Sequence, residues 1–306
     1  MPAANPGALS LRSFRGVPIA NLFHARPIEV VDRICFVWQI LVYKIVTIQR
    51  RAAMNTTIET VKSVFMQNNV PVFGIAQSSC LENDPPGYRP SDTLPSARSI
   101  LCMGIPVPTG VFQCKERLNE TYWRVANISY RNIDAVLMQV ARIIEEQKEA
   151  AVPVFGCFPY DVRGKGDLWG YLSLVRMAEA VRIGKLGKNG LLFNSKYGPR
   201  LLLGGIITTA LLPAMAWPQE DDTGCPEHCY ICQESCPVGA IDRNGKVDRV
   251  ACIKHSMKSP IFSYFMRTKD FDASDVQMIN YLTGVDDHSM YTCIRCVSTC
   301  PFSIKA

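Results

Sequence analysis

Apolar and polar residues along the chain form blocks that predict helices and strands in turn. A helix is predicted just after Met54, where Thr56 or Thr57 can cap it and the apolar positions Ile58, Val61, Val64 and Phe65 recur at the helical period. The strongest helical pattern covers residues 132–150, with apolar positions on one face at Ile133, Val136, Leu137, Val140 and Ile144. A further helix is predicted over residues 168–183.

Four apolar runs bounded by proline, glycine or polar loops predict buried strands, over residues 70–76, 97–107, 152–158 and 199–212. Their alternation with helices indicates an α/β or α+β layer structure, and α+β is the fold class predicted. From Gly224 the composition changes to cysteine, turns and short segments, so a boundary is expected near Trp217–Gly224. The expected domains are an N-terminal basic and apolar extension (1–53), a cofactor-binding domain (54–220) and a cysteine-rich domain (221–306).

The N-terminal extension is basic, because seven Lys or Arg stand against two acidic residues in positions 1–53, which leaves about +1 of the net +6 for the rest. A basic nucleic-acid-binding surface is therefore not expected. The apolar segment Ile34–Ile48 is shorter than a membrane span and is interrupted by Gln39 and Lys44. A buried or surface-lying helix is expected there, with membrane association as the alternative that is not favoured. No apolar stretch follows Arg50–Arg51, so these residues are not an export signal and a cytoplasmic location is expected.

Cysteine is the residue that points to chemistry. Clustered cysteines in a chain of 306 residues indicate a metal site in a reducing compartment rather than a disulfide scaffold. One run consists of Cys225, Cys229, Cys232 and Cys236–Pro237, and a second run consists of Cys293, Cys296 and Cys300–Pro301. The second run is one cysteine short, and Cys252 is the natural missing ligand.

Such runs are typical of modules with two iron–sulfur clusters, in which the last cysteine of a run binds the other cluster. The spacing therefore predicts one [4Fe–4S] cluster on Cys225, Cys229, Cys232 and Cys300, and a second on Cys236, Cys252, Cys293 and Cys296. Zinc is the alternative, but it prefers pairs of CxxC over interlocked runs ending in Cys-Pro. One departure is the first interval, which has three residues where the bacterial run has two, and it leaves His228 as a remote alternative to Cys225 as a ligand.

A glycine-rich stretch over residues 183–209 contains six glycines without a dinucleotide-binding fingerprint. Two interpretations stay open from spacing alone: close approach of the backbone to a large flat ligand, or purely architectural turns.

The stretch LGKNGLLFNSKYGPRLLLGGIITT, followed by the double cysteine module, resembles the corrinoid-dependent reductases, namely epoxyqueuosine reductases and reductive dehalogenases. LPSARSILCMGIPVP (94–108) and YWRVANISYRNIDAVLMQVAR (122–142) also resemble segments of the epoxyqueuosine reductases. The resemblance implies a nitroreductase-like α/β sandwich domain that binds cobalamin, followed by a two-cluster ferredoxin-like domain. It places Gly187, Lys188, Asn189, Gly190, Gly198 and Thr208 in the corrinoid-contacting region.

The resemblance also implies a proton donor, for which Asp167, Asp161 and the phenol of Tyr130 are the candidates, although the residues around the two aspartates depart from the family pattern. Since the sequence ends six residues after Cys300, and since residues 54–306 are nearly neutral, a tRNA substrate is not expected and a small-molecule substrate is. Electrons are expected from a ferredoxin or flavodoxin. Two rival functions stay open: a non-catalytic electron carrier that docks a partner, and a flavin-dependent reductase that holds FMN.

Overall fold

The computed structural model describes residues 38–44, 57–115, 118–156, 160–163, 167–218, 224–256 and 293–303. The chain separates into two compact units, Met1–Ala53 and Met54–Ala306. In the first unit a helix covers residues 38–44; the rest of the segment Ile34–Ile48 lies outside the described residues, as do Arg50, Arg51 and Thr56. Within the described ranges, no helix is long and apolar enough to cross a membrane. The three-part division of the chain predicted above stays a prediction.

A five-stranded antiparallel sheet forms the centre of the second unit, in the order β3-β8-β2-β1-β9. Its strands are β1 (Val72–Gln77), β2 (Ser99–Pro106), β3 (Ala151–Val154), β8 (Leu201–Thr208) and β9 (Met215–Trp217). All residues of β8 are buried, as expected of a continuous apolar run. Four of the strands overlap the four predicted segments and β9 was not predicted, so the expectation of a mixed helix-and-sheet fold is confirmed.

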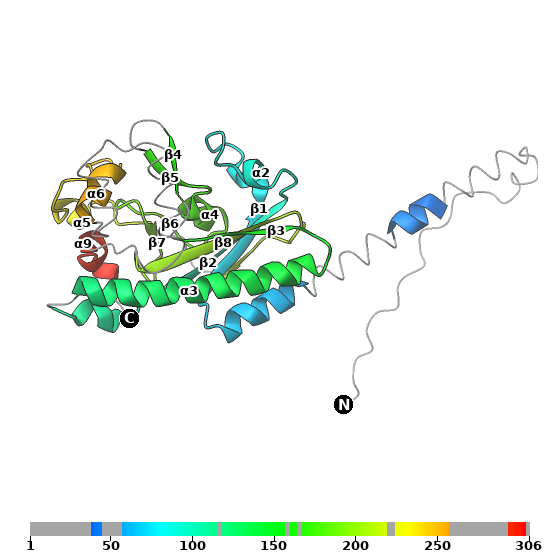
Figure 1. Cartoon of the computed structure of the whole chain (residues 1–306), viewed down its shortest axis with the longest axis horizontal. Helices are drawn as coiled ribbons and strands as arrows, with labels where there is room; N and C mark the ends of the chain where they lie inside the picture. The colour runs from blue at the N-terminus through cyan, green and yellow to red at the C-terminus, as the bar shows by residue number, and fades with distance from the viewer. Residues whose placement is uncertain are drawn as a thin grey trace, which may run out of the picture. The chain divides into compact units, whose positions relative to one another are not determined.

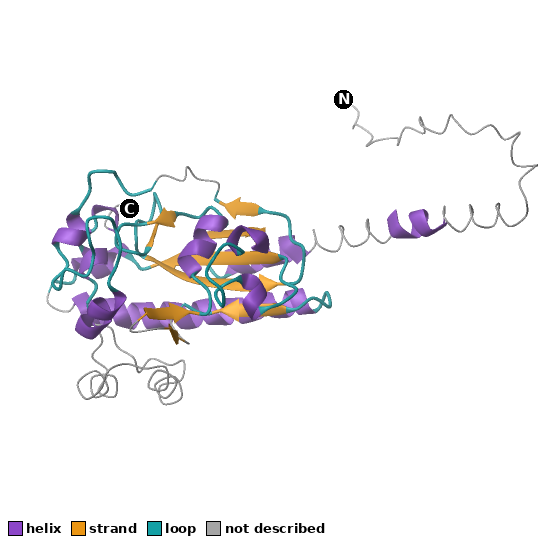
Figure 2. Ribbon diagram, turned by 90° about the horizontal axis from the view of Figure 1, so that it is seen from above, coloured by secondary structure: helices purple, strands orange, loops and turns teal. Residues whose placement is uncertain are grey.

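Helices cover both faces of this sheet. The helix over residues 57–67 and α3 (Leu118–Glu145) pack on one face, and α4 (Leu174–Ala180) packs on the other. Figure 2 shows the sheet between the long α3 and the helices opposite. Two adjacent glycines of β8 allow this close packing, because an added Cβ would lie 2.4 Å from Ile133 Cγ2 at Gly204 and 2.7 Å from Met177 Cε at Gly205.

Helix α3 begins well before the predicted segment 132–150. Its buried stripe extends backward through Ala126 to Tyr122, in register with Ile133. Asn127, Ser129 and Asn132 between these positions have weak helix propensity, and they concealed the pattern in the sequence. The extension matters because it carries Tyr130 and the aromatic pair Tyr122 and Trp123 toward the cysteine-rich part of the chain.

The helix predicted over residues 168–183 is wrong for residues 168–173, which are not helical. Strand β5 (Asp167–Gly170) pairs there with β4 (Tyr160–Arg163), and α4 starts only at Leu174. Ser173 caps α4, since its hydroxyl accepts a hydrogen bond from the Arg176 amide at 3.4 Å.

Short elements build the cysteine-rich part: α5 (Ile231–Glu234), α6 (Arg249–Ser256), α9 (Arg295–Ser298) and η4 (Pro301–Ser303). Figure 1 shows α5, α6 and α9 gathered near the N-terminal end of α3. Ile294 and Val297 belong to the same hydrophobic core as Tyr122 and Ala126 of α3. The cysteine-rich part is thus packed directly against the layered part. The remaining short elements are η2 (Ser78–Leu81), α2 (Pro90–Thr93) and η3 (Thr109–Gln113).

Candidate functional site

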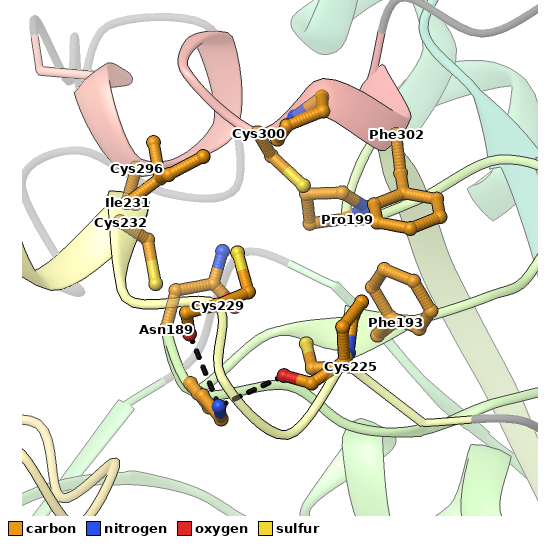
Figure 3. Close-up of a pocket in the computed structure, with 13 residues that line it drawn as sticks. Asn189, Phe193, Pro199, Cys225, Cys229, Ile231, Cys232, Cys296, Cys300 and Phe302 are labelled. Carbon is orange, nitrogen blue, oxygen red and sulfur yellow. Dashed lines mark hydrogen bonds between the residues drawn. The ribbon is translucent and has the colours of Figure 1, made fainter.

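The first group of thiols comes from two segments that are far apart in the sequence. Cys225 and Cys229 lie in the loop that leads into α5, Cys232 lies within α5, and Cys300 follows α9. Figure 3 shows these sulfur atoms turned toward one hollow. Burial raises the pKa of the Cys232 thiol, and the nearby thiolates of Cys225, Cys229 and Cys300 raise it further.

The second group also joins separate segments. Cys236 follows α5, Cys252 lies in α6, and Cys293 and Cys296 lie before and within α9. Burial raises the pKa of Cys252, and Cys293 and Cys236 raise it further. Burial raises the pKa of Cys296 to about 12, with further contributions from the thiolates of Cys252 and Cys293. Cys232 contributes to the same shift, so Cys296 lies close to both groups.

The interlocked partition that the spacing predicts stays a prediction, and the thiols that affect one another's pKa here fall into its two groups, with Cys296 also near Cys232. Two sets of four cysteine thiols are the donor set of two [4Fe–4S] clusters, so the residues present fit these groups. Because burial raises the pKa of the Cys232, Cys252, Cys296 and Cys300 thiols, iron binding must displace the protons of these four. Among the described residues, no three His, Cys, Asp or Glu side chains gather tightly enough for a single metal ion. A cubane cluster takes one thiolate per iron, so its ligands are spread more widely than those of one ion.

A cavity of about 750 Å³ adjoins the second group. Its volume is in the range of small-molecule and cofactor sites. The walls come from α3, the start of β8, the turn between β6 (Lys185–Leu186) and β7 (Leu192–Phe193), and α6. Cys252, Cys293 and Cys296 form part of the lining, so a ligand in this cavity would lie beside the second group. The lining residues that matter here are Tyr122, Trp123, Tyr130, Asn189, Gly190, Leu201, Lys246 and Arg249.

Of the residues predicted to contact a corrinoid, Asn189 and Gly190 line this cavity. Gly187 starts the turn that carries them, since its carbonyl accepts from the Gly190 amide at 2.9 Å. Lys188 points elsewhere, and its ammonium bonds to the loop that carries Cys225 and Cys229.

Gly198 and Thr208, which were predicted to contact a corrinoid, do not line the large cavity. Gly198 has a φ of +59°, and an added Cβ would lie 2.7 Å from the backbone carbon of Phe302, so its open side is already filled by the chain. Thr208 is fully buried at the end of β8, where its hydroxyl donates to the Ala150 carbonyl at 2.7 Å and accepts from the Ala210 amide at 3.0 Å. A structural role explains both residues, and we leave them out of the proposed contact set.

The candidate acids are placed differently. Tyr130 lines the cavity, and its ring passes so close to Gly156 that an added Cβ there would lie 2.4 Å from Tyr130 Cε1. Asp167 is the first residue of β5 and pairs with Arg163, while Asp161 of β4 pairs with Trp169. Gly170, at the other end of β5, lines the cavity. The roles of Tyr130 and Asp167 stay predictions.

Two features of the site were not predicted from the sequence. The aromatic pair Tyr122 and Trp123 lines the cavity beside Tyr130. All three residues lie on α3, so a prediction that the helix reaches back to Tyr122 could have placed the pair near Tyr130. The second is Asp134, which does not line either cavity but lies on α3 one helical turn after Tyr130. Burial raises its pKa to about 6, and its Oδ1 is buried without a hydrogen-bond partner among the described residues.

No family model matches the chain. The curated relatives that match are all epoxyqueuosine reductases. The protein from Listeria monocytogenes is 31% identical over 147 residues, which cover 47% of this chain and 33% of the relative. The protein from Bacillus cereus is 25% identical over 227 residues, which cover 70% of this chain and 50% of the relative. The chain therefore spans half or less of the length of these curated relatives.

Solved structures show the same fold. Epoxyqueuosine reductase from Streptococcus thermophilus aligns with a TM-score of 0.53 and 18% identity, covering 83% of this chain and 67% of the solved one. The catabolic reductive dehalogenase NpRdhA aligns with a TM-score of 0.46 and 15% identity, covering 65% of this chain and 29% of the solved one.

The expectation against tRNA is contradicted. An epoxyqueuosine reductase of the same fold has been solved with an epoxyqueuosine-modified tRNA-Tyr stem loop, with a TM-score of 0.53 and 18% identity to this chain. The argument from net charge was weak because a total charge averages over the whole surface and hides local basic patches. Lys246 and Arg249 are such exposed basic residues at the cavity. The resemblance to the epoxyqueuosine reductases that the sequence predicts is thus confirmed by the curated relatives and by the fold.

Proposed function

We propose that this protein is an iron–sulfur reductase of the epoxyqueuosine reductase type. It passes electrons through two [4Fe–4S] clusters to a cobalamin-type cofactor and reduces epoxyqueuosine in tRNA. The observation that carries the proposal is the juxtaposition of the second cysteine group with the large cavity, whose lining includes Cys252, Cys293 and Cys296. A redox cofactor in that cavity would receive electrons directly from the second cluster.

The order of electron transfer follows from the positions of the thiols. Among the cysteines that the structure describes, Cys252, Cys293 and Cys296 of the second group line the large cavity. Cys225, Cys229, Cys232 and Cys300 line a separate small cavity. Cys296 lines both cavities and lies near both groups. The first cluster is therefore the entry point for electrons and the second cluster is the exit toward the cavity.

The cavity residues supply binding and proton transfer. A bound corrinoid would supply a cobalt centre of low potential for the reduction. The apolar side chains of Leu201 and Leu202 exclude water from the wall beside β8. Asn189 supplies an amide at the turn, and its buried position restricts how that amide is oriented. Tyr130 holds a proton on its phenolic oxygen at the wall, where a reduced substrate would need one.

The exposed basic residues fit a tRNA substrate. Lys246 and Arg249 line the cavity while remaining exposed to solvent. Basic side chains beside a pocket contact phosphates and so position a nucleic acid without reading its sequence. The modified base of the tRNA would then enter the cavity while Lys246 and Arg249 bind the phosphates of the tRNA backbone next to it.

The test uses the full chain, reconstituted with iron and sulfide in the absence of oxygen. The protein is incubated with cobalamin, freed of unbound cofactor, and given tRNA that carries epoxyqueuosine together with dithionite as reductant. We expect about eight iron atoms per chain, retained cobalamin, and consumption of epoxyqueuosine measured by mass spectrometry of the digested tRNA.

Two results contradict the proposal. Full iron content without cobalamin retention favours a non-catalytic electron carrier. Retention of FMN in place of cobalamin favours a flavin-dependent reductase. Omission of dithionite is the control, because without a reductant epoxyqueuosine must persist.

A further inference from the structure

Lys188 occupies a rigid position beside the first cysteine group. It lies in the turn between β6 and β7, where the Gly187 amide donates to the Leu191 carbonyl at 2.7 Å and the Gly190 amide donates to the Gly187 carbonyl at 2.9 Å. Gly245 packs on its backbone, since an added Cβ there would lie 3.4 Å from Lys188 Cα. The turn therefore fixes where the long side chain starts.

The ammonium group of Lys188 ends on the loop between the first two cysteines. Lys188 Nζ donates to the carbonyls of Pro226 (2.9 Å), Glu227 and Cys229 (3.0 Å). Figure 3 draws such bonds as dashed lines beneath the sulfur atoms. An ammonium group has three donors, so all three are used. The same group lies 4.6 Å from the centroid of the Tyr230 ring, which adds a cation–π contact.

The bonded carbonyls belong to the interval that departs from the usual spacing. Three residues separate Cys225 from Cys229, where the bacterial run has two. A backbone hydrogen bond from the Cys229 amide to the Pro226 carbonyl, at 3.1 Å, closes this longer loop. The extra residue adds a carbonyl that must find a donor, and Lys188 supplies it. The loop can then place both thiols although it is longer.

We infer that Lys188 is a positioning residue for the first [4Fe–4S] cluster, which holds the lengthened loop and raises the reduction potential of the cluster. This inference rests on the proposed function, because it assumes that the first group binds a cluster. Lys188 lines the same small cavity as Cys225, Cys229, Cys232 and Cys300. A reduced cluster carries one more negative charge, so a fixed cation nearby favours the reduced state.

The test compares the wild type with Lys188→Met, Lys188→Arg and Lys196→Met. Lys196 is a matched control, because it is an exposed lysine on the following turn whose ammonium lies over Tyr197 and not on the cysteine loop. Hydrogen–deuterium exchange of the metal-free protein reports how firmly the loop is held. Iron content and an EPR-monitored redox titration of the reconstituted protein report the cluster.

Lys188→Met is expected to speed exchange of the peptide over residues 225–232 and to reduce the iron content from about eight to about four atoms per chain. In the fraction that keeps both clusters, the reduction equilibrium of the first cluster should shift about tenfold toward the oxidised state, which equals about 59 mV for one electron. Lys188→Arg should keep the iron and the potential, and Lys196→Met should match the wild type in every measurement.

The inference is overturned if Lys188→Met exchanges like the wild type and keeps both the iron and the potential. It is also overturned if Lys196→Met causes the same changes, since the effect would then be one of total charge. A wild type that binds no iron contradicts the proposed function instead, and the exchange measurement on the metal-free protein still decides whether Lys188 holds the loop.

Discussion

Replacing Gly198 by alanine tests how the layered part of the fold holds a cluster ligand. Gly198 has a φ of +59°, and an added Cβ would lie 2.7 to 2.8 Å from the carbonyl carbon, the oxygen and the Cβ of Phe302. The Phe302 ring packs edge-on against Phe193, with 4.8 Å between centroids. Phe302 follows Cys300 by two residues, so pushing it away moves a predicted ligand of the first cluster.

The magnitude follows from two separate costs. Alanine in the left-handed region costs roughly 1–2 kcal/mol. Relaxed carbon–carbon contacts need about 3.5 Å, so the neighbouring chain must move by roughly 0.7 Å, and overpacking of this kind costs about 1–3 kcal/mol. We therefore expect Gly198→Ala to lower the free energy of unfolding by about 2–5 kcal/mol in total.

Gly239 provides a matched control. Its φ is +60°, almost the same as that of Gly198, but an added Cβ would meet nothing within 4 Å. Gly239→Ala should therefore cost only the backbone part, roughly 1–2 kcal/mol. The difference between the two variants isolates the contact with Phe302.

The assay is urea unfolding of the metal-free protein, together with iron content after reconstitution. Gly198→Ala should show the larger loss of stability and should fall from about eight to about four iron atoms per chain, while Gly239→Ala keeps its iron. Equal losses of stability in the two variants would refute the reasoning, because the contact with Phe302 would then contribute nothing.

Further predictions concern the cavity and α3. Tyr130→Phe should lower the turnover of epoxyqueuosine about 10²- to 10⁴-fold, while iron content and cobalamin retention stay unchanged; unchanged turnover would remove Tyr130 as the proton source. Burial raises the pKa of Asp134 from 3.8 to about 6, so the folded state favours the protonated carboxyl, and the stability of the wild type should fall as the pH rises from about 4 to 6. Asp134→Asn should remove this fall and raise the free energy of unfolding at pH 8 by roughly 1 kcal/mol, allowing for solvent screening, with little change at pH 4. Urea unfolding at the two pH values checks this, and an equal effect at both would show that the charge is not responsible.

The sequence predicted the features that depend on local patterns. The apolar runs of β1, β2 and β8 are bounded by turns, and their buried character can be read directly. The proposed grouping of the cysteines also comes from spacing, because the interlocked arrangement is a general rule for two-cluster modules, and it stays a prediction. These features need no knowledge of distant contacts.

The features that were missed depend on contacts between distant segments. Nothing near Gly198 indicates that Phe302 fills its open side, so the glycine was read as a ligand contact. Lys188 and Asn189 are neighbours in one turn and both line the small cavity, yet of the two only Asn189 also lines the large one, and only the fold sets these directions. The first half of α3 was missed because polar residues interrupt its apolar stripe, although Tyr122 and Ala126 are buried.

The interlocked partition is the claim on which the electron path depends, and one double variant tests it most directly. Cys225→Ala combined with Cys300→Ala removes two ligands from the first group and none from the second. The partition predicts that about four iron atoms per chain remain, with the EPR signal of one [4Fe–4S] cluster. If each cysteine run held its own cluster, the double variant would damage both clusters and leave almost no iron, and that result would contradict the account.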